Sequence, residues 1–233
     1  MKKFILVLIL LIYLIFNYDY IRFHSVNKKD DKFILIKDLY LSNDYCNKLS
    51  NLILNQSLKK SNVLSEAFES SYGILIKFKD NNQAKKIFDK NNLTDIYNLF
   101  KKIKKPDCDA FVFNSLIINS NKSKEIESHY DNTLSIKHGL LNRDILPKWV
   151  TVIYIKLPKK FTGGKLLLNN FSNFNFYYPK CTIIPEVGKL VQFRGDAYHL
   201  VEEIKANSED YRISLVFEQY QIGNIDFPFY VNI

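Results

Sequence analysis

The sequence predicts a mainly β fold with flanking helices, of the α+β class. Its 233 residues are 47% hydrophobic and 15% aromatic, which suffices for one compact domain with a sizeable core and excludes a chain that is disordered throughout. Before Pro106 the apolar residues recur largely at helical spacing, whereas from Ala110 onward they form short runs separated by Gly, Pro and Asn. Short strands at such spacing indicate an antiparallel sandwich, a barrel or a jelly roll.

The first part of the domain is expected to combine strands with helices. The expected strands cover 32–36 and 73–78. The N-cap residues of Ser42–Asp44 precede a helix over 45–53, because Ser, Asn and Asp side chains accept hydrogen bonds from the first amides of a helix. The apolar spacing over 83–102 predicts two further helices that meet near Asn92.

The second part is expected to consist of strands joined by turns. The expected strands cover 110–119, 149–157, 165–168, 181–184, 189–193, 198–204 and 211–220. Arg194–Asp196 is expected to form the turn that leads into the strand of His199. The segment from Thr133 to Pro147, which carries His138, is expected to be a surface connection.

The amino-terminal segment, residues 1–26, is expected to lie outside the globular domain of residues 27–233. Met1-Lys2-Lys3 precedes the apolar run Phe4–Phe16, and a short basic region before such a run predicts an uncleaved signal-anchor or, alternatively, a cleaved signal peptide. The run is shorter than the roughly 20 residues of a full membrane span, and a buried strand or helix is the structural alternative. The signal interpretation implies the membrane of the endoplasmic reticulum or another secretory compartment, with a lumenal domain.

The net charge and the cysteine content exclude few classes of function. The formal net charge is +9, which permits contact with nucleic acid or anionic membranes without requiring it, because the lysines are spread along the chain. Cys46, Cys108 and Cys181 are an odd number at wide spacing, which excludes a disulfide framework, and no CxxC pair indicates a zinc site. A single Cys108–Cys181 disulfide in an oxidising lumen remains open.

Two histidines and one aspartate form a candidate metal site. His129 and Asp131 are two residues apart, so on a strand both side chains face the same way, and His199 lies in a later expected strand. Two imidazoles and a carboxylate on one side of a metal leave positions open for other ligands, as non-haem Fe(II) oxygenases require. The simpler alternative is a hydrogen-bonded His–Asp pair at the surface.

Arg212 is a candidate anion-binding residue. It lies within the otherwise apolar strand Tyr211–Phe217, where an unpaired buried charge would be very costly. The planar guanidinium suits a carboxylate partner. The alternative is an edge-strand arginine whose side chain faces water.

The order of these elements resembles the prolyl 4-hydroxylase-type 2-oxoglutarate- and Fe(II)-dependent dioxygenases, over roughly residues 32–220. The matching segments are Leu41–Cys46, His129–Asp131, Thr151–Ile155, Phe161–Leu166, Pro185–Phe193, His199–Val201 and Tyr211–Ser214. The resemblance implies a double-stranded β-helix (jelly roll) core preceded by an amino-terminal helical segment. It also implies that His129, Asp131 and His199 bind Fe(II), that Arg212 holds the distal carboxylate of 2-oxoglutarate, and that Ser214 assists Arg212.

The activity implied is hydroxylation of an unactivated C–H bond, with dioxygen and 2-oxoglutarate consumed, succinate and CO2 released, and ascorbate as the reductant. Peptidyl proline is the first expected target and lysine the second, so the expected partner is a protein or peptide. Lys165 stands where the family has an acid, Arg212 where many prolyl 4-hydroxylases have Lys, and Asn169–Pro179 has no counterpart. These departures bear on the substrate more than on the iron site.

Other functions remain open on the same residues. Repair of alkylated nucleic acid would suit the net charge, but the amino-terminal segment and the lack of any arginine after Arg212 oppose it. A small-molecule oxygenase and a non-catalytic jelly-roll binding module are the further alternatives. The oligomeric state does not follow from the sequence.

Overall fold

The computed structural model describes residues 34–57, 60–61, 71–121, 123–138, 141–169, 179–206, 210–223 and 230–231. The predicted signal-anchor or signal peptide therefore lies outside the described residues, as does most of Asn169–Pro179. Within the described part of the chain, no helix has the length and apolar character needed to cross a membrane.

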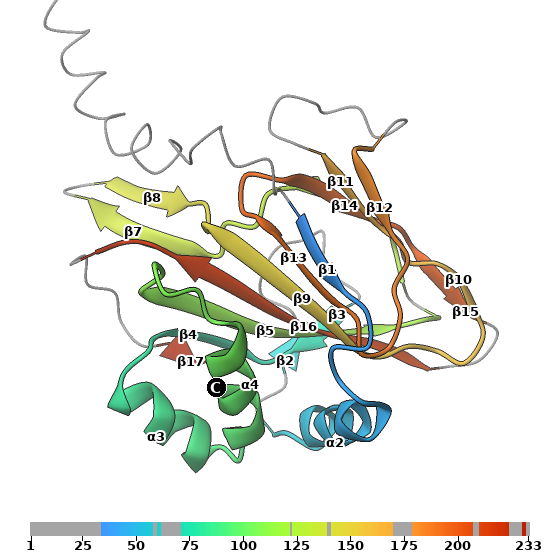
Figure 1. Ribbon diagram of the computed structural model, residues 1–233, viewed down its shortest axis with the longest axis horizontal. Coiled ribbons are helices and arrows are strands. Elements are labelled where there is room, and N and C mark those ends of the chain that lie inside the picture. Colours follow the sequence, from blue (N-terminus) through green and yellow to red (C-terminus); the bar gives the residue numbers. More distant parts are fainter. Residues whose placement is uncertain are drawn as a thin grey trace, which may run out of the picture.

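Antiparallel sheets dominate the fold, which confirms the predicted class (Figure 1). The large sheet has the order β1 (Ile34–Lys37), β13 (Leu190–Arg194), β9 (Trp149–Lys156), β16 (Tyr211–Tyr220), β5 (Ala110–Asn119), β3 (Ser71–Gly73) and β2 (Lys60–Ser61), with β4 (Leu75–Lys79) pairing with β5 and with β17 (Tyr230–Val231). The small sheet has the order β12 (Cys181–Ile183), β11 (Leu166–Asn169), β14 (Tyr198–Val201) and β6 (Ile126–His129). Two further pairs join β10 (Phe161–Gly163) to β15 (Ile204–Ala206) and β7 (Leu134–His138) to β8 (Leu141–Ile145).

Three helices lie along one side of the large sheet (Figure 1). They are α2 (Asn43–Leu54), α3 (Asn82–Lys90) and α4 (Thr94–Ile103). The Ser42 hydroxyl accepts a hydrogen bond from the Tyr45 amide at 3.3 Å and so caps α2, as predicted. The predicted division of the second helical stretch is also confirmed, because Asn92 adopts a left-handed φ of 56° between α3 and α4.

Side chains on alternate positions of the central strands face two different sides of the large sheet and belong to two separate cores. On β16, Ile213, Leu215 and Phe217 belong to the core beneath the helices. The intervening side chains, from Arg212 to Glu218, line a cavity between the large and small sheets. Because strand side chains alternate between faces, one strand supplies both the apolar support and the polar site.

The prediction of a surface connection over Thr133–Pro147 is wrong. Strands β7 and β8 form a hairpin in this segment, and His138 is the last residue of β7. The base of this hairpin is held by the buried side chains of Leu134 and Ile145, which belong to a cluster with Tyr220. Those apolar residues alternate with polar neighbours, and that pattern was the signal for a strand.

The three cysteines are free thiols, so the Cys108–Cys181 disulfide is not present. Cys108 belongs to the core beneath the helices, whereas Cys181 packs against the core between the sheets. Burial raises the pKa of the Cys108 thiol to about 12, which makes it unreactive at neutral pH. Cys108 and Cys181 therefore lie on opposite sides of the large sheet, which explains why they do not form a disulfide.

Asp80 ties the end of β4 to α4, and its loss is expected to destabilise the fold. Its carboxylate accepts hydrogen bonds from Tyr97 Oη at 2.7 Å, Lys101 Nζ at 3.0 Å and Lys104 Nζ at 2.5 Å. Partial burial opposes ionisation, but these hydrogen bonds outweigh it and lower the pKa of Asp80 to about 2. Since the folded pKa lies below the unfolded value, the stabilisation is complete above about pH 4 and is lost as the pH falls towards 2.

We therefore expect Asp80→Asn to lower the free energy of unfolding by about 2 kcal/mol at pH 6 and by less at pH 3. Urea unfolding of both proteins at the two pH values measures the difference. A difference that does not change with pH would contradict the ionic origin of this contact.

Candidate metal and co-substrate site

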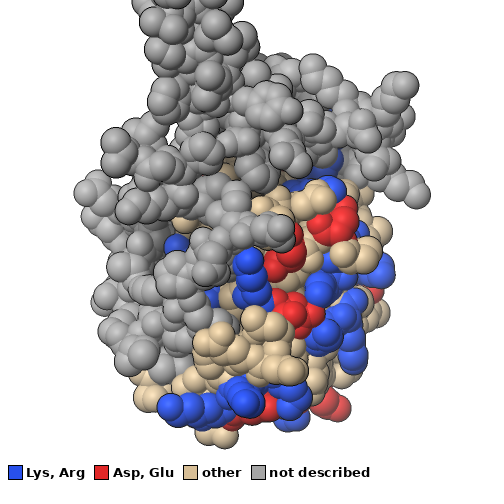
Figure 2. Space-filling model, turned by 90° about the vertical axis from the view of Figure 1, so that its left-hand side faces the viewer, with Lys and Arg blue, Asp and Glu red and all other residues tan. Residues whose placement is uncertain are grey.

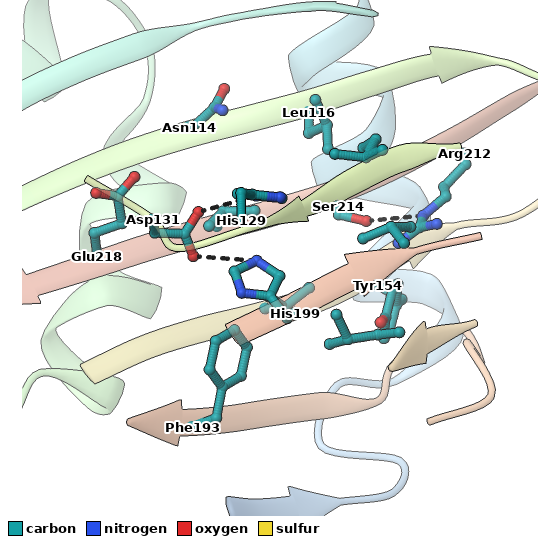
Figure 3. Close-up of a pocket in the computed structure, with 15 residues that line it drawn as sticks. Asn114, Leu116, His129, Asp131, Tyr154, Phe193, His199, Arg212, Ser214 and Glu218 are labelled. Carbon is teal, nitrogen blue, oxygen red and sulfur yellow. Dashed lines mark hydrogen bonds and ion pairs between the residues drawn. The ribbon is translucent and has the colours of Figure 1, made fainter. Parts of the chain in front are cut away.

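Strand pairing brings the three predicted metal ligands together (Figure 3). His199 on β14 lies opposite His129 at the end of β6, and their ring centroids are 4.3 Å apart. Asp131 lies just beyond β6 rather than on a strand. Its Oδ1 is 3.8 Å from His129 Nε2 and its Oδ2 is 3.6 Å from His199 Nε2.

Backbone carbonyls set the orientation of both imidazoles. His129 Nδ1 lies 2.7 Å from the Glu127 carbonyl oxygen, and His199 Nδ1 lies 3.1 Å from that of Ala197. A proton donated from each Nδ1 leaves the Nε2 lone pair facing Asp131 and available to a metal. Burial, with a further contribution from His129, lowers the pKa of His199 to about 4, so this ring is neutral at pH 7.

These ligand atoms fit a divalent metal. They lie within 4.8 Å of one another, and the distances from Nε2 to the carboxylate are too long for hydrogen bonds. Two atoms that each bind an ion at about 2.1 Å lie at most about 4.2 Å apart, which accommodates both measured separations. Two neutral imidazoles and one carboxylate are the donor set of non-haem Fe(II) sites.

Arg212 lines the same cavity, and its guanidinium is buried, with 3% of the residue exposed. It donates to the Gly164 carbonyl at 3.2 Å and to Ser214 Oγ at 3.4 Å, and it lies over the Tyr154 ring at 5.3 Å from the centroid. No Asp or Glu among the described residues forms an ion pair with it. The anion that the sequence analysis required is therefore not supplied by this part of the chain.

Tyr154 is a site residue that the sequence analysis treated only as part of a strand. Its hydroxyl is fully buried and has no hydrogen-bond partner among the described residues. A buried guanidinium without an acid, beside a buried hydroxyl without an acceptor, fits a bound carboxylate. The two side chains could therefore hold one carboxylate together. Alternation along β9, which directs Val152 and Tyr154 into the cavity, was the available signal.

The Gly163–Gly164 turn places one of the contacts of Arg212. Gly163 has a φ of +73°, and a Cβ atom there would lie 2.1 Å from the Glu203 carbonyl oxygen, so this position requires glycine. The next residue, Gly164, offers its carbonyl to Arg212. Lys165, which stands where the family has an acid, forms an ion pair with Glu202 at 3.7 Å.

Glu218 and Asn114 also line the cavity and were not singled out from the sequence. Glu218 is 2% exposed and accepts hydrogen bonds from Thr133 Oγ1 at 2.5 Å, from the Thr133 amide at 3.3 Å and from the Tyr220 hydroxyl. Burial and the nearby charge of Asp131 raise the pKa of Glu218 to about 7. Glu218 is six positions after Arg212 on the same predicted strand, so the two side chains must lie on the same face of the sheet. This even spacing was the sequence signal that could have identified Glu218.

Comparisons with known proteins identify the fold. By sequence, no protein-family model and no curated protein matches the chain significantly. A Trichoplax adhaerens prolyl hydroxylase, solved with a hypoxia-inducible-factor peptide fragment, matches with a TM-score of 0.51 and 14% identity over 90% of this chain and 93% of that one. IDO from Bacillus thuringiensis matches with a TM-score of 0.52 and 14% identity over 84% and 98%. A 2OG-Fe(II) oxygenase family oxidoreductase from Burkholderia pseudomallei has a TM-score of 0.49 and 12% identity over 82% and 87%.

Proposed function

Because the chain has the jelly-roll fold of the 2-oxoglutarate- and Fe(II)-dependent oxygenases, as the sequence resemblance implied, we propose that it is such a dioxygenase. The reaction would convert a substrate C–H bond, dioxygen and 2-oxoglutarate into C–OH, succinate and CO2. One observation carries the proposal. The His129–Asp131–His199 group shares a cavity with the buried Arg212 and Tyr154, which together lack an anion among the described residues.

Each part of the cavity has a defined role in this reaction. His129, Asp131 and His199 would hold Fe(II), which would supply the activation of dioxygen that hydroxylation requires. Arg212 and Tyr154 bind the distal carboxylate of 2-oxoglutarate and so direct its keto-acid end towards the metal ligands. The backbone hydrogen bonds of both histidines hold their rings in place before the co-substrate arrives.

A protein or peptide is the proposed substrate, with proline as the first residue to test and lysine as the second. The sequence resemblance to prolyl 4-hydroxylases supports this choice, and the Trichoplax prolyl hydroxylase of the same fold is in complex with a peptide. Ascorbate is the proposed reductant that keeps the iron ferrous.

The function is tested by succinate formation from 2-oxoglutarate. The full-length protein, purified without metal, is supplied with Fe(II), ascorbate and oxygen, with and without pools of proline- and lysine-containing peptides. We expect iron-dependent turnover that peptides stimulate. A folded protein that neither binds iron nor turns over 2-oxoglutarate would support the non-catalytic binding module instead.

The charged surface does not favour nucleic acid as the substrate. Figure 2 shows a face on which the Lys and Arg side chains of the described residues lie among Asp and Glu. Several of the lysines are engaged in ion pairs, including Lys85 with Asp89 at 2.7 Å and Lys148 with Asp107 at 2.6 Å. On this face, the positive charge of the described residues is thus partly neutralised by neighbouring carboxylates.

Residues 1–26 are proposed to direct the protein to a secretory-pathway membrane with the enzyme domain in the lumen. The basic start and the apolar run Phe4–Phe16 support this localisation. Protease protection of the full-length chain in microsomes tests it, because a lumenal domain resists digestion until the membrane is dissolved.

A further inference from the structure

The cavity continues past the metal ligands, away from Arg212. Arg212, Ser214, Val216 and Glu218 occupy alternate positions on β16 and all line the cavity. Arg212 and Glu218 are six positions apart on this strand, which corresponds to about 20 Å of backbone at 3.3 Å per residue. Figure 3 shows His129, Asp131 and His199 between these two residues.

A bound 2-oxoglutarate molecule is too short to fill both ends of the cavity. Its five-carbon chain is about 6 Å long at standard bond lengths. With the distal carboxylate on Arg212, a molecule of this length cannot also reach Glu218. The end of the cavity near Glu218 is therefore left for the molecule that is hydroxylated.

The Glu218 end offers buried hydrogen-bonding groups to that molecule. Protein donors from Thr133 and Tyr220 occupy three acceptor positions on the Glu218 carboxylate, and a carboxylate has about four. Within the described ranges, Lys77 interacts electrostatically with Glu218, but no Lys, Arg or His forms a direct ion pair with it. Asn114 is 5% exposed and also lines this cavity, so its side-chain amide is available to a bound molecule.

We propose that this end of the cavity binds a primary ammonium group of the substrate, with Glu218 as the counter-ion and Asn114 as a second hydrogen-bonding partner. The inference rests on the proposed function and narrows its substrate class. A buried carboxylate gains most from a cationic donor, and an ammonium supplies three N–H groups to share between Glu218 and Asn114. A proline ring has no donor to offer and would leave both groups unsatisfied. Among peptide residues, the site therefore favours lysine over proline.

A purely structural role for Glu218 makes a different prediction. Its bonds to Thr133 and Tyr220 anchor the segment that follows Asp131, and Lys77 Nζ donates to the Thr133 carbonyl at 2.5 Å in the same network. Anchoring accounts for those bonds but gives no role to the polar side chain of Asn114 in the cavity lining. Loss of anchoring would weaken every ligand alike, whereas loss of a counter-ion would weaken only a cationic one.

The test measures binding without turnover. The full-length protein is loaded with Mn(II) and 2-oxoglutarate in the absence of oxygen and titrated calorimetrically with Gly-Gly-X-Gly-Gly peptides, where X is lysine, norleucine or proline. We expect the lysine peptide to bind at least about tenfold more tightly than the norleucine peptide. Glu218→Gln should remove this preference and leave norleucine binding unchanged, whereas Thr133→Val, which keeps the carboxylate, should retain it.

Equal affinities for lysine and norleucine, tighter binding of proline, or no binding of the lysine peptide would overturn the inference. If Glu218→Gln does not fold, Asn114→Ala takes its place and should weaken lysine binding several-fold with norleucine unaffected. A protein that binds neither Mn(II) nor 2-oxoglutarate would overturn the proposed function itself, and this inference with it.

Discussion

We expect Asp131→Ala to reduce the proposed metal-dependent turnover of 2-oxoglutarate by at least about 100-fold. Asp131 is the one carboxylate of the three-residue metal group and lies 3.6 Å from His199 Nε2 and 3.8 Å from His129 Nε2. Its removal leaves only two imidazoles as ligands, which would hold a ferrous ion weakly. Calorimetric titration with Mn(II) and succinate formation with Fe(II) measure binding and turnover separately.

Asp144→Ala is the matched control for this variant. Asp144 is an exposed carboxyl on β8 whose Oδ1 accepts a hydrogen bond from the Ser135 hydroxyl, and it is not among the residues that line the cavity. We expect it to retain both metal binding and turnover. Full metal affinity in Asp131→Ala would place the metal elsewhere and remove the basis of the proposed function.

Arg212→Met is expected to lose 2-oxoglutarate binding by about 100-fold or more without losing stability. The guanidinium supplies charge-assisted hydrogen bonds to the distal carboxylate, and methionine supplies none. Without 2-oxoglutarate, however, the buried Arg212 lacks an acid among the described residues. Replacing an uncompensated buried charge by an apolar side chain of similar length is neutral or stabilising.

Thermal unfolding with and without 2-oxoglutarate measures both effects. A saturating concentration, about 100 times Kd, should raise the Tm of the metal-loaded wild-type protein by roughly 5–10 °C and leave that of Arg212→Met unchanged. Tyr154→Phe should bind 2-oxoglutarate about tenfold more weakly, because it removes one hydrogen bond and no charge. A large fall in the Tm of ligand-free Arg212→Met would show instead that Arg212 stabilises the fold.

The pattern of apolar runs and turn residues along the chain was enough to predict the central strands. Ala110–Asn119 and Tyr211–Tyr220 form strands over the predicted residues, because continuous apolar runs bounded by turn residues specify buried strands. The helix after Ser42 and the division near Asn92 follow from capping side chains and local backbone preference. The hairpin within Thr133–Pro147 was missed because its apolar signal is short and its buried contacts are with the distant Tyr220.

By itself, the sequence determined which residues are chemically capable of forming the site. They are two histidines, one aspartate and an arginine that lies within an apolar strand. Only the tertiary structure decided what surrounds them. The pairing of β14 with β6 brings His199 to His129, and β9 beside β16 places Tyr154 under Arg212. Burial then leaves the Tyr154 hydroxyl without a partner among the described residues, and it shifts the pKa values of His199 and Glu218. These properties depend on neighbours that are distant in sequence and on the exclusion of water, neither of which is encoded in local spacing.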